Sequence, residues 1–341
     1  MRPFVYEQPA DVSTAVAIAS RFTTNDDQPT RANAQFIAGG TNLADYMKLG
    51  VADPNRLLDL NKLKEQELRH IHVTNEGGIR FGALARMGEA ADHAEVKRRY
   101  PVIADSLRLA ASGQIRNMAS LAGNVLQRTR CEYFRETSWA CNKRVPGSGC
   151  AAMEGFNRQH AILGASDACI ATYHGDFAQA LIALDAVVHA EGSRGARKIV
   201  FAKLHRQPGD TPHIETDLAA DEIITAIEVP AIPWARRSLY LKIRDRESYA
   251  FALASAAVAL DLDGETVREA RIALGGVATV PWRAGAAEQS LQGKKLDEAS
   301  AEATAEAAFA QAQPRRHNAF KMELGKRTLV RALLETRDMK V

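Results

Sequence analysis

Cysteine is scarce in this sequence, with four residues in 341. So few cysteines in so long a chain exclude a disulfide-dense secreted scaffold and favour metal or redox chemistry. Long apolar runs are scarce too: the longest, residues 249–260, is shorter than the ~20 residues that a membrane-spanning helix needs, so we expect no membrane span. The first residues, MRPFVYEQPADVST, have no apolar core and no small-residue cleavage site, and we expect no secretory signal there.

A strong charge of either sign is also missing. The 44 basic residues exceed the 41 acidic residues by only 3 and are scattered along the chain, so we expect no nucleic-acid partner. Neither G-x-G-x-x-G nor G-x-x-x-x-G-K-[ST] occurs, which disfavours Rossmann and P-loop nucleotide sites. The composition that remains, 46% hydrophobic and 25% charged, is typical of a globular protein, and the length favours two or three domains.

Both helical and strand periodicities occur along the chain. Asp11 and Asp176 each precede apolar residues at helical spacing, so both are expected to cap helices. Further helices are expected at residues 41–50, at 87–98, from Pro101 onward and over much of 283–336. Strands are expected at residues 34–40, 57–60, 68–74, 79–85, 186–190, 197–202, 222–229, 238–244, 250–262 and 268–275. A change of composition at residues 230–233 marks a boundary, so the sequence predicts an α+β fold with a separate C-terminal domain.

The segment AGGTNL (38–43) places two glycines between an expected strand and an expected helix. Glycine lets backbone N–H groups approach an anion at a helix N-terminus, as a phosphate cradle requires. Taken alone, this pattern more often marks a tight turn without a ligand. A second segment, IRNMASLAGN (115–124), follows an expected helix and offers further hydroxyl and backbone donors.

Together, AGGTNL and IRNMASLAGN resemble the FAD-binding subunits and domains of the xanthine dehydrogenase family of molybdenum hydroxylases. The likeness covers nearly the whole chain, since four further segments look like successive landmarks of that family: DFAQALIALDA (176–186), DEIITAIEVP (221–230), YLKIRDRESYAFALASAAVAL (240–260) and RIALGGVATVPWRA (271–284). The resemblance implies a two-part FAD-binding domain of the vanillyl-alcohol-oxidase / p-cresol-methylhydroxylase type, at residues 1–60 and 61–230. It also implies a C-terminal α+β domain at 231–341, with a three-stranded sheet and helices.

The resemblance also implies which residues bind FAD. The backbone of the glycine loop would hold the pyrophosphate, and a second group would line the other side of the cofactor. The first group is Ile37, Ala38, Gly39, Gly40, Thr41, Asn42 and Leu43, and the second is Ser120, Gly123 and Asn124. Asp176 matches an aspartate near the ribityl or diphosphate end, and Ile224 and Lys242 match positions beside the flavin ring. A lysine there would stabilise the anionic reduced flavin, whereas outside this family Lys242 would be a solvated strand residue.

The four cysteines lie in an insertion at about 127–170, which ordinary members of the family lack. They are Cys131, Cys141, Cys150 and Cys169. Four thiolates suffice for a [4Fe–4S] cluster, although spacings of nine, eight and eighteen intervening residues match no short ferredoxin run. Disulfides, a zinc site with four cysteine ligands and buried inert cysteines stay open. No C-x2-4-C zinc knuckle occurs, and the polar stretch RVPGSG (144–149) does not look like core.

Flavin subunits with an additional iron–sulfur insertion form a branch of this family, which includes periplasmic aldehyde oxidoreductases and 4-hydroxybenzoyl-CoA reductase. Residues 142–173 look most similar to the aldehyde oxidoreductase branch. This resemblance implies a [4Fe–4S] cluster on the four cysteines. Residues 128–158 contain six basic residues against three acidic ones, and this surplus would offset the negative charge of the cluster unless it forms a solvated basic face.

The function implied is that of the FAD-binding electron-transfer subunit of a heterotrimeric, molybdenum-containing aldehyde oxidoreductase. A large subunit would hold the molybdenum cofactor and oxidise the substrate, a small subunit would carry two [2Fe–2S] clusters, and FAD would pass electrons to an external acceptor. No catalytic residue is therefore expected in this chain. We expect a periplasmic location, by export with a signal-bearing partner, or otherwise a cytoplasmic one. A stand-alone FAD oxidoreductase and a structural subunit whose four cysteines bind zinc stay open as alternatives.

Overall fold

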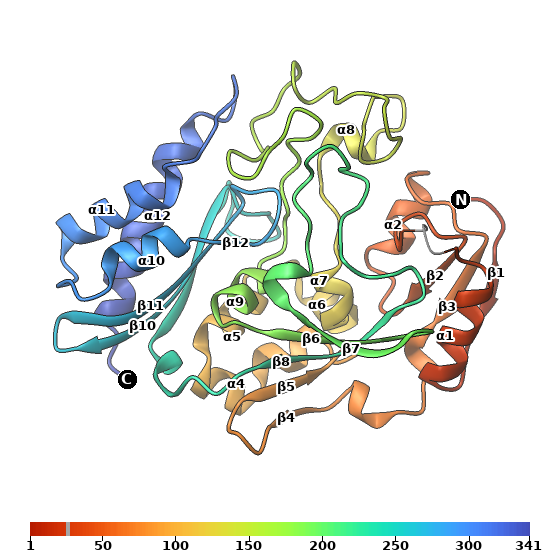
Figure 1. The fold of residues 1–341 in the computed structure, drawn as a ribbon, viewed down its shortest axis with the longest axis horizontal. Helices are drawn as coiled ribbons and strands as arrows, with labels where there is room; N and C mark the ends of the chain where they lie inside the picture. Colours follow the sequence, from red (N-terminus) through yellow and green to blue (C-terminus); the bar gives the residue numbers. More distant parts are fainter. Residues whose placement is uncertain (25–27) are drawn as a thin grey trace.

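The structure, a computed structural model, describes residues 1–24 and 28–341. Three β-sheets organise the molecule: a small N-terminal sheet, a central sheet and a C-terminal sheet (Figure 1). Helices accompany all three, so the predicted α+β class is confirmed. Among the described residues, no helix is both long enough and apolar enough to cross a membrane.

The N-terminal part is a parallel sheet with strand order β1-β3-β2 and two helices. Its elements are β1 (Val5–Glu7), α1 (Val12–Arg21), β2 (Ala34–Ile37), α2 (Leu43–Lys48) and β3 (Arg56–Asp59). Asp11 caps α1 as predicted, because its side chain accepts a hydrogen bond from Thr14 N at 2.8 Å. The glycine loop leaves the carboxyl end of β2, and α/β sheets bind ligands at this edge.

The central part is an antiparallel sheet with strand order β4-β5-β8-β6-β7. Its strands are β4 (Ile71–Val73), β5 (Ile79–Gly82), β6 (Val187–Gly192), β7 (Gly195–Val200) and β8 (Ile223–Val229). Its helices are α3 (Met87–Asp92), α4 (Ala94–Arg99), α5 (Pro101–Arg108), α6 (Gly113–Met118), α7 (Leu121–Val125) and α9 (Phe177–Ala183). Pro101 begins α5 as predicted. The single helix predicted over 87–98 is wrong, because the backbone of His93 is extended (ψ 127°) and separates α3 from α4.

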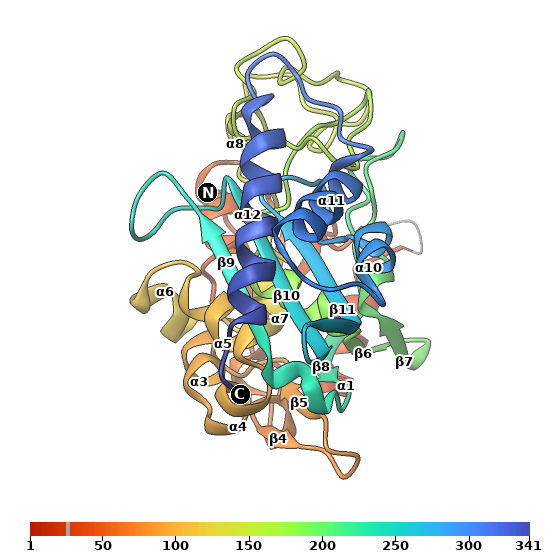
Figure 2. The ribbon, with the colours of Figure 1, turned by 90° about the vertical axis from the view of Figure 1, so that its left-hand side faces the viewer.

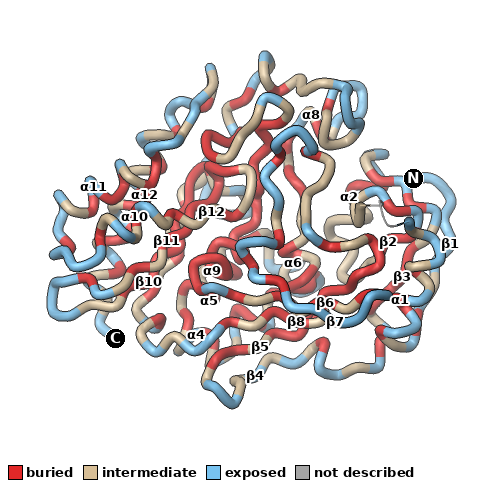
Figure 3. The backbone as a smooth tube through the Cα atoms, viewed as in Figure 1, coloured by how far each residue is buried: buried red, intermediate tan, exposed pale blue. Residues whose placement is uncertain are grey.

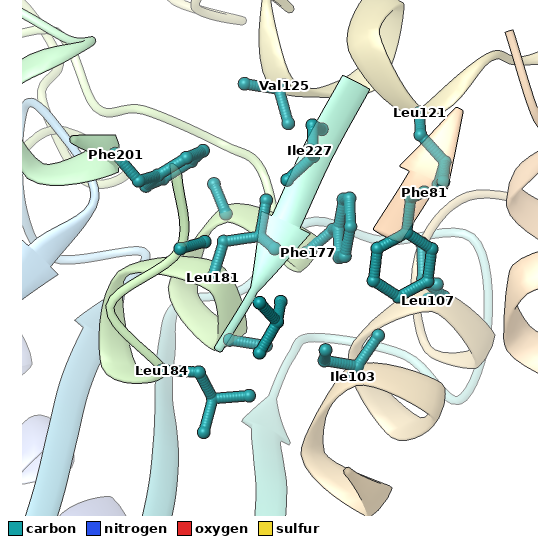
Figure 4. Close-up of a cluster of buried hydrophobic side chains, with 14 of the residues drawn as sticks. Phe81, Ile103, Leu107, Leu121, Val125, Phe177, Leu181, Leu184, Phe201 and Ile227 are labelled. Carbon is teal, nitrogen blue, oxygen red and sulfur yellow. The ribbon is translucent and has the colours of Figure 1, made fainter. Parts of the chain in front are cut away.

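Helix α9 lies at the centre of the main hydrophobic core, and all seven of its residues are buried. Phe177 packs edge to face against Phe81 of β5, with ring centroids 6.0 Å apart. Leu107 of α5 and Ile227 of β8 belong to the same cluster (Figure 4). Buried backbone follows the central sheet and the helices packed on it, and continues into the C-terminal sheet (Figure 3). The helices that line the site described below therefore rest on well-packed apolar side chains.

The C-terminal part is an antiparallel sheet covered on one face by three helices (Figure 2). Its elements are β9 (Ser238–Ile243), β10 (Ala254–Asp263), β11 (Thr266–Gly275), β12 (Trp282–Arg283), α10 (Gly285–Leu291), α11 (Glu298–Phe309) and α12 (Phe320–Arg337). The three long strands are those that the sequence predicts. The two-residue strand β12 extends the predicted three-stranded sheet to four.

Residues 127–170 form a cap of loops with one short helix, α8 (Glu132–Arg135), near the start of α12 (Figures 1 and 2). The tip of the polar stretch, residues 145–148, is exposed, as its composition suggests. The cysteines nevertheless lie in a small core of their own, where Phe134 and Ile170 pack with Tyr46 from the N-terminal part. The polar stretch is therefore no part of the core, as predicted, while the cysteines on either side of it are packed in one.

Candidate functional site

The loop that follows β2 depends on its two glycines. A Cβ atom at Gly39 would overlap the carbonyl group of Met118, and Gly40 has φ +71°, which residues with side chains rarely adopt. Asn42, at the start of α2, makes no capping hydrogen bond with its side chain. Its amide nitrogen instead donates to Gly123 O at 3.1 Å. The AGGTNL and ASLAGN segments, distant in sequence, therefore meet in the fold.

Two cavities adjoin this junction and share Thr41 and Asn42 in their walls. The smaller, of about 190 Å³, is lined by all seven residues of the glycine loop, 37–43, and by Ser120 and Gly123. The larger has a volume of about 860 Å³, within the range of about 300–1,000 Å³ that cofactor pockets occupy. The structure thus brings together the residues that the sequence predicts for the pyrophosphate.

Asn124 and Asp176, both predicted to bind FAD, line the larger cavity. Asn124 Oδ1 is buried without a hydrogen-bond partner in the described part of the chain, so a bound ligand can satisfy it. The hydroxyl of Ser120 is already engaged, because it accepts a hydrogen bond from Gly123 N at 3.2 Å and caps α7. Ser120 therefore shapes the wall of the cavity and holds the backbone of ASLAGN in place.

Asp176 does not cap α9, contrary to the prediction. Its side chain makes no capping bond, because its carboxylate accepts hydrogen bonds from Lys242 Nζ at 2.8 Å and from Tyr240 OH at 2.7 Å. Burial raises the pKa of Asp176 above its ordinary value, and the positive charge of Lys242 opposes that shift. The result is a buried ion pair that joins the central part to the C-terminal sheet beside the larger cavity.

Ile224 and Lys242 are buried in the protein interior and do not face the two cavities that the structure describes. Ile224, on β8, is 4% exposed and belongs to the main core. The side chain of Lys242, on β9, is 1% exposed, so it is not the solvated strand residue of the alternative interpretation. Over the residues that the structure describes, neither side chain lines the two cavities. Their predicted positions beside the flavin ring stay predictions.

Arg130 is a component of the site that the sequence did not single out. Its guanidinium donates to Asn42 Oδ1 at 2.9 Å and to Tyr46 OH at 2.7 Å, and it lines the larger cavity. It also lies over the ring of Phe251, at 5.5 Å from the centroid, in the connection between β9 and β10 that lines the cavity. Arg130 thus joins the glycine loop to the cavity wall and adds a positive charge where an anionic ligand would bind.

The four cysteines lie close to one another beside this site. All are free thiols; Cys131, Cys141 and Cys169 are buried, and Cys150 is partly exposed. Burial raises the pKa of Cys131 to about 12 and that of Cys169 to about 11. The negative charge of Cys141 raises the pKa of each of the other three, as expected for sulfur atoms in electrostatic contact. In residues 1–24 and 28–341, no three His, Cys, Asp or Glu side chains are grouped to hold a single metal ion.

The basic residues of the insertion do not form a solvated face. Each engages a carboxylate, a carbonyl group or another polar side chain. Four of them form ion pairs: Arg128 with Glu215 at 2.6 Å, Lys143 with Glu215 at 3.4 Å, Arg135 with Asp45 at 2.6 Å and Arg158 with Asp245 at 2.9 Å. Arg130 donates to Asn42 at 2.9 Å, and Arg144 donates to the carbonyl oxygens of Tyr133 and Phe134 at 2.9 and 2.7 Å. The positive charges therefore fix the loops around the cysteines, which a surplus of solvated cations would not do.

Comparison with known proteins assigns these features to a family. Residues 2–232 match the family described as "FAD binding domain in molybdopterin dehydrogenase", and residues 239–336 match "CO dehydrogenase flavoprotein C-terminal domain". The chain is 47% identical to the aldehyde oxidoreductase FAD-binding subunit PaoB of Escherichia coli, over 99% of each chain. It is 26% identical to the carbon monoxide dehydrogenase medium chain of Hydrogenophaga pseudoflava, over 91% of this chain and 88% of that one.

Solved structures support the same family assignment. A carbon monoxide dehydrogenase chain from Hydrogenophaga pseudoflava has a TM-score of 0.74 and 26% identity, with 98% of this chain and 96% of that chain covered. The site also fits the cofactor that the family binds, since it offers a close-packed glycine loop, an unpaired buried amide oxygen and cavities of suitable size. The chain therefore belongs to the FAD-binding medium subunits of the molybdenum hydroxylase family, whose members are subunits of oxidoreductases.

Proposed function

We propose that this chain is the electron-transfer subunit of a molybdenum-containing aldehyde oxidoreductase. The support is the 47% identity to PaoB, which extends over 99% of both chains and so includes the insertion with the four cysteines. FAD, when bound, exchanges electrons singly or in pairs and so connects one-electron and two-electron partners.

The chain's own residues would bind and orient the flavin cofactor. We propose that the glycine loop, 37–43, accepts the pyrophosphate at the start of α2, where backbone N–H groups favour an anion. Arg130 adds a positive charge on the adjoining wall. Gly123 and Asn124 complete the opposite wall, and Asp176 lies farther along the larger cavity.

We further propose that Cys131, Cys141, Cys150 and Cys169 hold a [4Fe–4S] cluster. The observation that carries this proposal is that four free thiols, separated by up to 38 positions, gather in one small core beside the flavin cavity. Burial raises the pKa of Cys131, Cys150 and Cys169 and so favours their protonated form in the metal-free chain, whereas a metal centre deprotonates the thiols that coordinate it. A bound cluster would supply one-electron transfer next to the flavin.

Zinc and disulfides are weaker alternatives for the same cysteines. One zinc ion draws its four ligands to about 2.3 Å from a common centre, and the described residues contain no such group. A four-iron cluster holds its thiolates farther apart than one zinc ion does. A disulfide would join two of the four sulfur atoms, whereas all four cysteines are free thiols here.

The remaining partners follow from the proposed complex. We propose a large subunit with the molybdenum cofactor, a small subunit with two [2Fe–2S] clusters, and an external electron acceptor. We also propose export to the periplasm with a signal-bearing partner, which cell fractionation with and without that partner would test. A stand-alone flavin oxidoreductase is disfavoured because the relatives that match nearly the whole chain are named as subunits or medium chains of larger oxidoreductases.

The decisive experiment is anaerobic purification of the full complex, followed by metal analysis and EPR before and after dithionite. We expect about four iron atoms per chain beyond those of the small subunit, and a reduced-cluster EPR signal. Cys150→Ser should abolish both while FAD remains bound. Val145→Ser, a change to the same residue type at an exposed position of the same loop, is the matched control and should leave both intact. Zinc in place of the additional iron would overturn the cluster proposal.

A further inference from the structure

His160 contacts one of the four cysteines directly. Its Nε2 lies 3.1 Å from Cys131 Sγ, and the residue is 5% exposed. Two backbone hydrogen bonds fix its position: His160 N donates to Asn157 O at 3.1 Å, and Asn318 Nδ2, just before α12, donates to His160 O at 3.2 Å. The ring is therefore held against the sulfur by both the insertion and the C-terminal part.

In the part of the chain that the structure describes, the ring of His160 makes no other hydrogen bond. His160 Nδ1 is buried and, over the described residues, has no hydrogen-bond partner. The aromatic ring of Tyr133 lies 6.1 Å away and supplies only a tilted ring contact. A metal-bound thiolate has no proton to donate, so an N–H···S hydrogen bond requires the imidazole to carry its proton on Nε2.

We propose that His160 is a positioning residue that donates a hydrogen bond to the Cys131 thiolate and thereby raises the reduction potential of the cluster. This inference rests on the cluster proposed above. A hydrogen bond to a ligand sulfur withdraws negative charge from it, and reduction adds negative charge, so the bond stabilises the reduced state more than the oxidised state. Hydrogen bonds to the sulfur atoms are among the factors that set cluster potentials.

The contact between His160 and Cys131 lies close to the flavin cavity. His160 and Cys131 line a small cavity of about 30 Å³ together with Gln159 and His174. Gln159 and His174 also line the larger cavity, so this ligand is on the flavin-facing side of the cysteine core. A residue that sets the potential at this ligand therefore controls the driving force between the cluster and the flavin.

A buried lysine lies near His160, on the side of the C-terminal part. Lys321 of α12 is fully buried, and its ammonium group donates to Gln159 O at 3.0 Å and to Gly276 O at 2.6 Å. Burial, aided by the charge of Arg158 and opposed by the charge of Asp245, lowers the pKa of Lys321 to about 7, so the positive form is only partly populated near neutral pH. Its positive field acts in the same direction as the hydrogen bond from His160, because both stabilise added negative charge on the cluster.

The test is a potentiometric titration of the full complex, followed by EPR of this cluster, in wild type, His160→Leu and His160→Gln. Loss of the hydrogen bond in His160→Leu should reduce the equilibrium constant for one-electron reduction about tenfold, a potential lower by about 59 mV. His160→Gln keeps an N–H donor and should recover part of the shift. His205→Gln is the matched control: it is a half-buried histidine whose Nε2 contacts Val125 O at 3.0 Å and, among the described residues, no sulfur.

The outcomes separate this inference from the proposed cluster. Wild type without the additional iron would overturn both. A cluster that is present in all variants at unchanged potential would overturn the role of His160 alone. If His160→Leu does not assemble, ENDOR of the wild type with and without 15N-labelled histidine still decides, because the backbone N–H of Ala171 also donates to a cysteine sulfur at 3.4 Å and exchangeable protons alone would not identify His160. A coupling that changes with the histidine label supports the hydrogen bond, and its absence refutes it.

Discussion

Replacing Lys242 with methionine tests the buried ion pair beside the larger cavity. The side chains of Lys242 and Asp176 are 1% and 5% exposed, and their charged groups are 2.8 Å apart. The change would remove the ammonium group and keep a side chain of similar length. Leu109 O, which accepts a hydrogen bond from Lys242, would keep one from Arg244 at 3.2 Å. The main consequence is therefore an unpaired carboxylate.

Breaking a buried ion pair from one side costs about 3–5 kcal/mol, because the remaining charge stays desolvated. We expect Lys242→Met to lower the free energy of unfolding by this amount near neutral pH. Asp176→Asn combined with Lys242→Met removes both charges and should lose less than the sum of the two single variants. Lys64→Met is the control, since the Lys64–Asp11 pair is exposed and its loss should be within experimental error.

The loss should also depend on pH. Burial already raises the pKa of Asp176 above 3.8, and removing Lys242 removes the charge that opposes this shift. The folded variant then binds a proton at Asp176 more tightly than the unfolded chain does, so stability falls as pH rises through the raised pKa. Denaturant unfolding at fixed FAD concentration should show a smaller loss at about pH 5 than at about pH 8. An equal loss at both pH values, or strict additivity in the double variant, would refute the reasoning.

Three further changes test other parts of the structure. Gly39→Ala places a Cβ against the backbone at the end of α6, so FAD should bind at least about tenfold more weakly in a flavin fluorescence titration. Arg130→Met removes a charged hydrogen bond to Asn42, worth about 1.5–3 kcal/mol, so FAD affinity should fall about tenfold or more, and Arg130→Lys should recover part of it. Gly325→Ala forces a methyl group into the ring of Phe309, so the free energy of unfolding should fall by about 1–3 kcal/mol in a thermal unfolding experiment while FAD binding is retained.

The sequence was informative wherever a local cause determines the structure. Asp11 caps α1 and Pro101 begins α5, because caps and proline act within a few residues of themselves. The same reasoning failed at Asp176, where Lys242, 66 positions away, supplies a stronger partner than the backbone N–H groups of α9. The break at His93 was missed for a related reason, since the periodicity of residues 87–98 continues through it.

In the candidate site, too, features with a local cause could be predicted and contacts between distant residues could not. The glycine loop could be found in the sequence because its backbone requires glycine at Gly39 and Gly40. Arg130 could not be singled out, because its partner Asn42 lies 88 positions earlier. His160 likewise meets Cys131 across 29 positions of irregular loop, where no periodic pattern places either residue.

Arg130 and Cys131 suggest why the insertion occurs where it does. Arg130 is tied to the glycine loop through Asn42, so the next residue in the chain is held beside the flavin cavity. The first cysteine therefore takes its position from the flavin site itself, and the other three reach it through the loops that follow. The contact between Arg130 and the glycine loop thus holds the proposed cluster beside the flavin site, as short-range electron transfer between them requires.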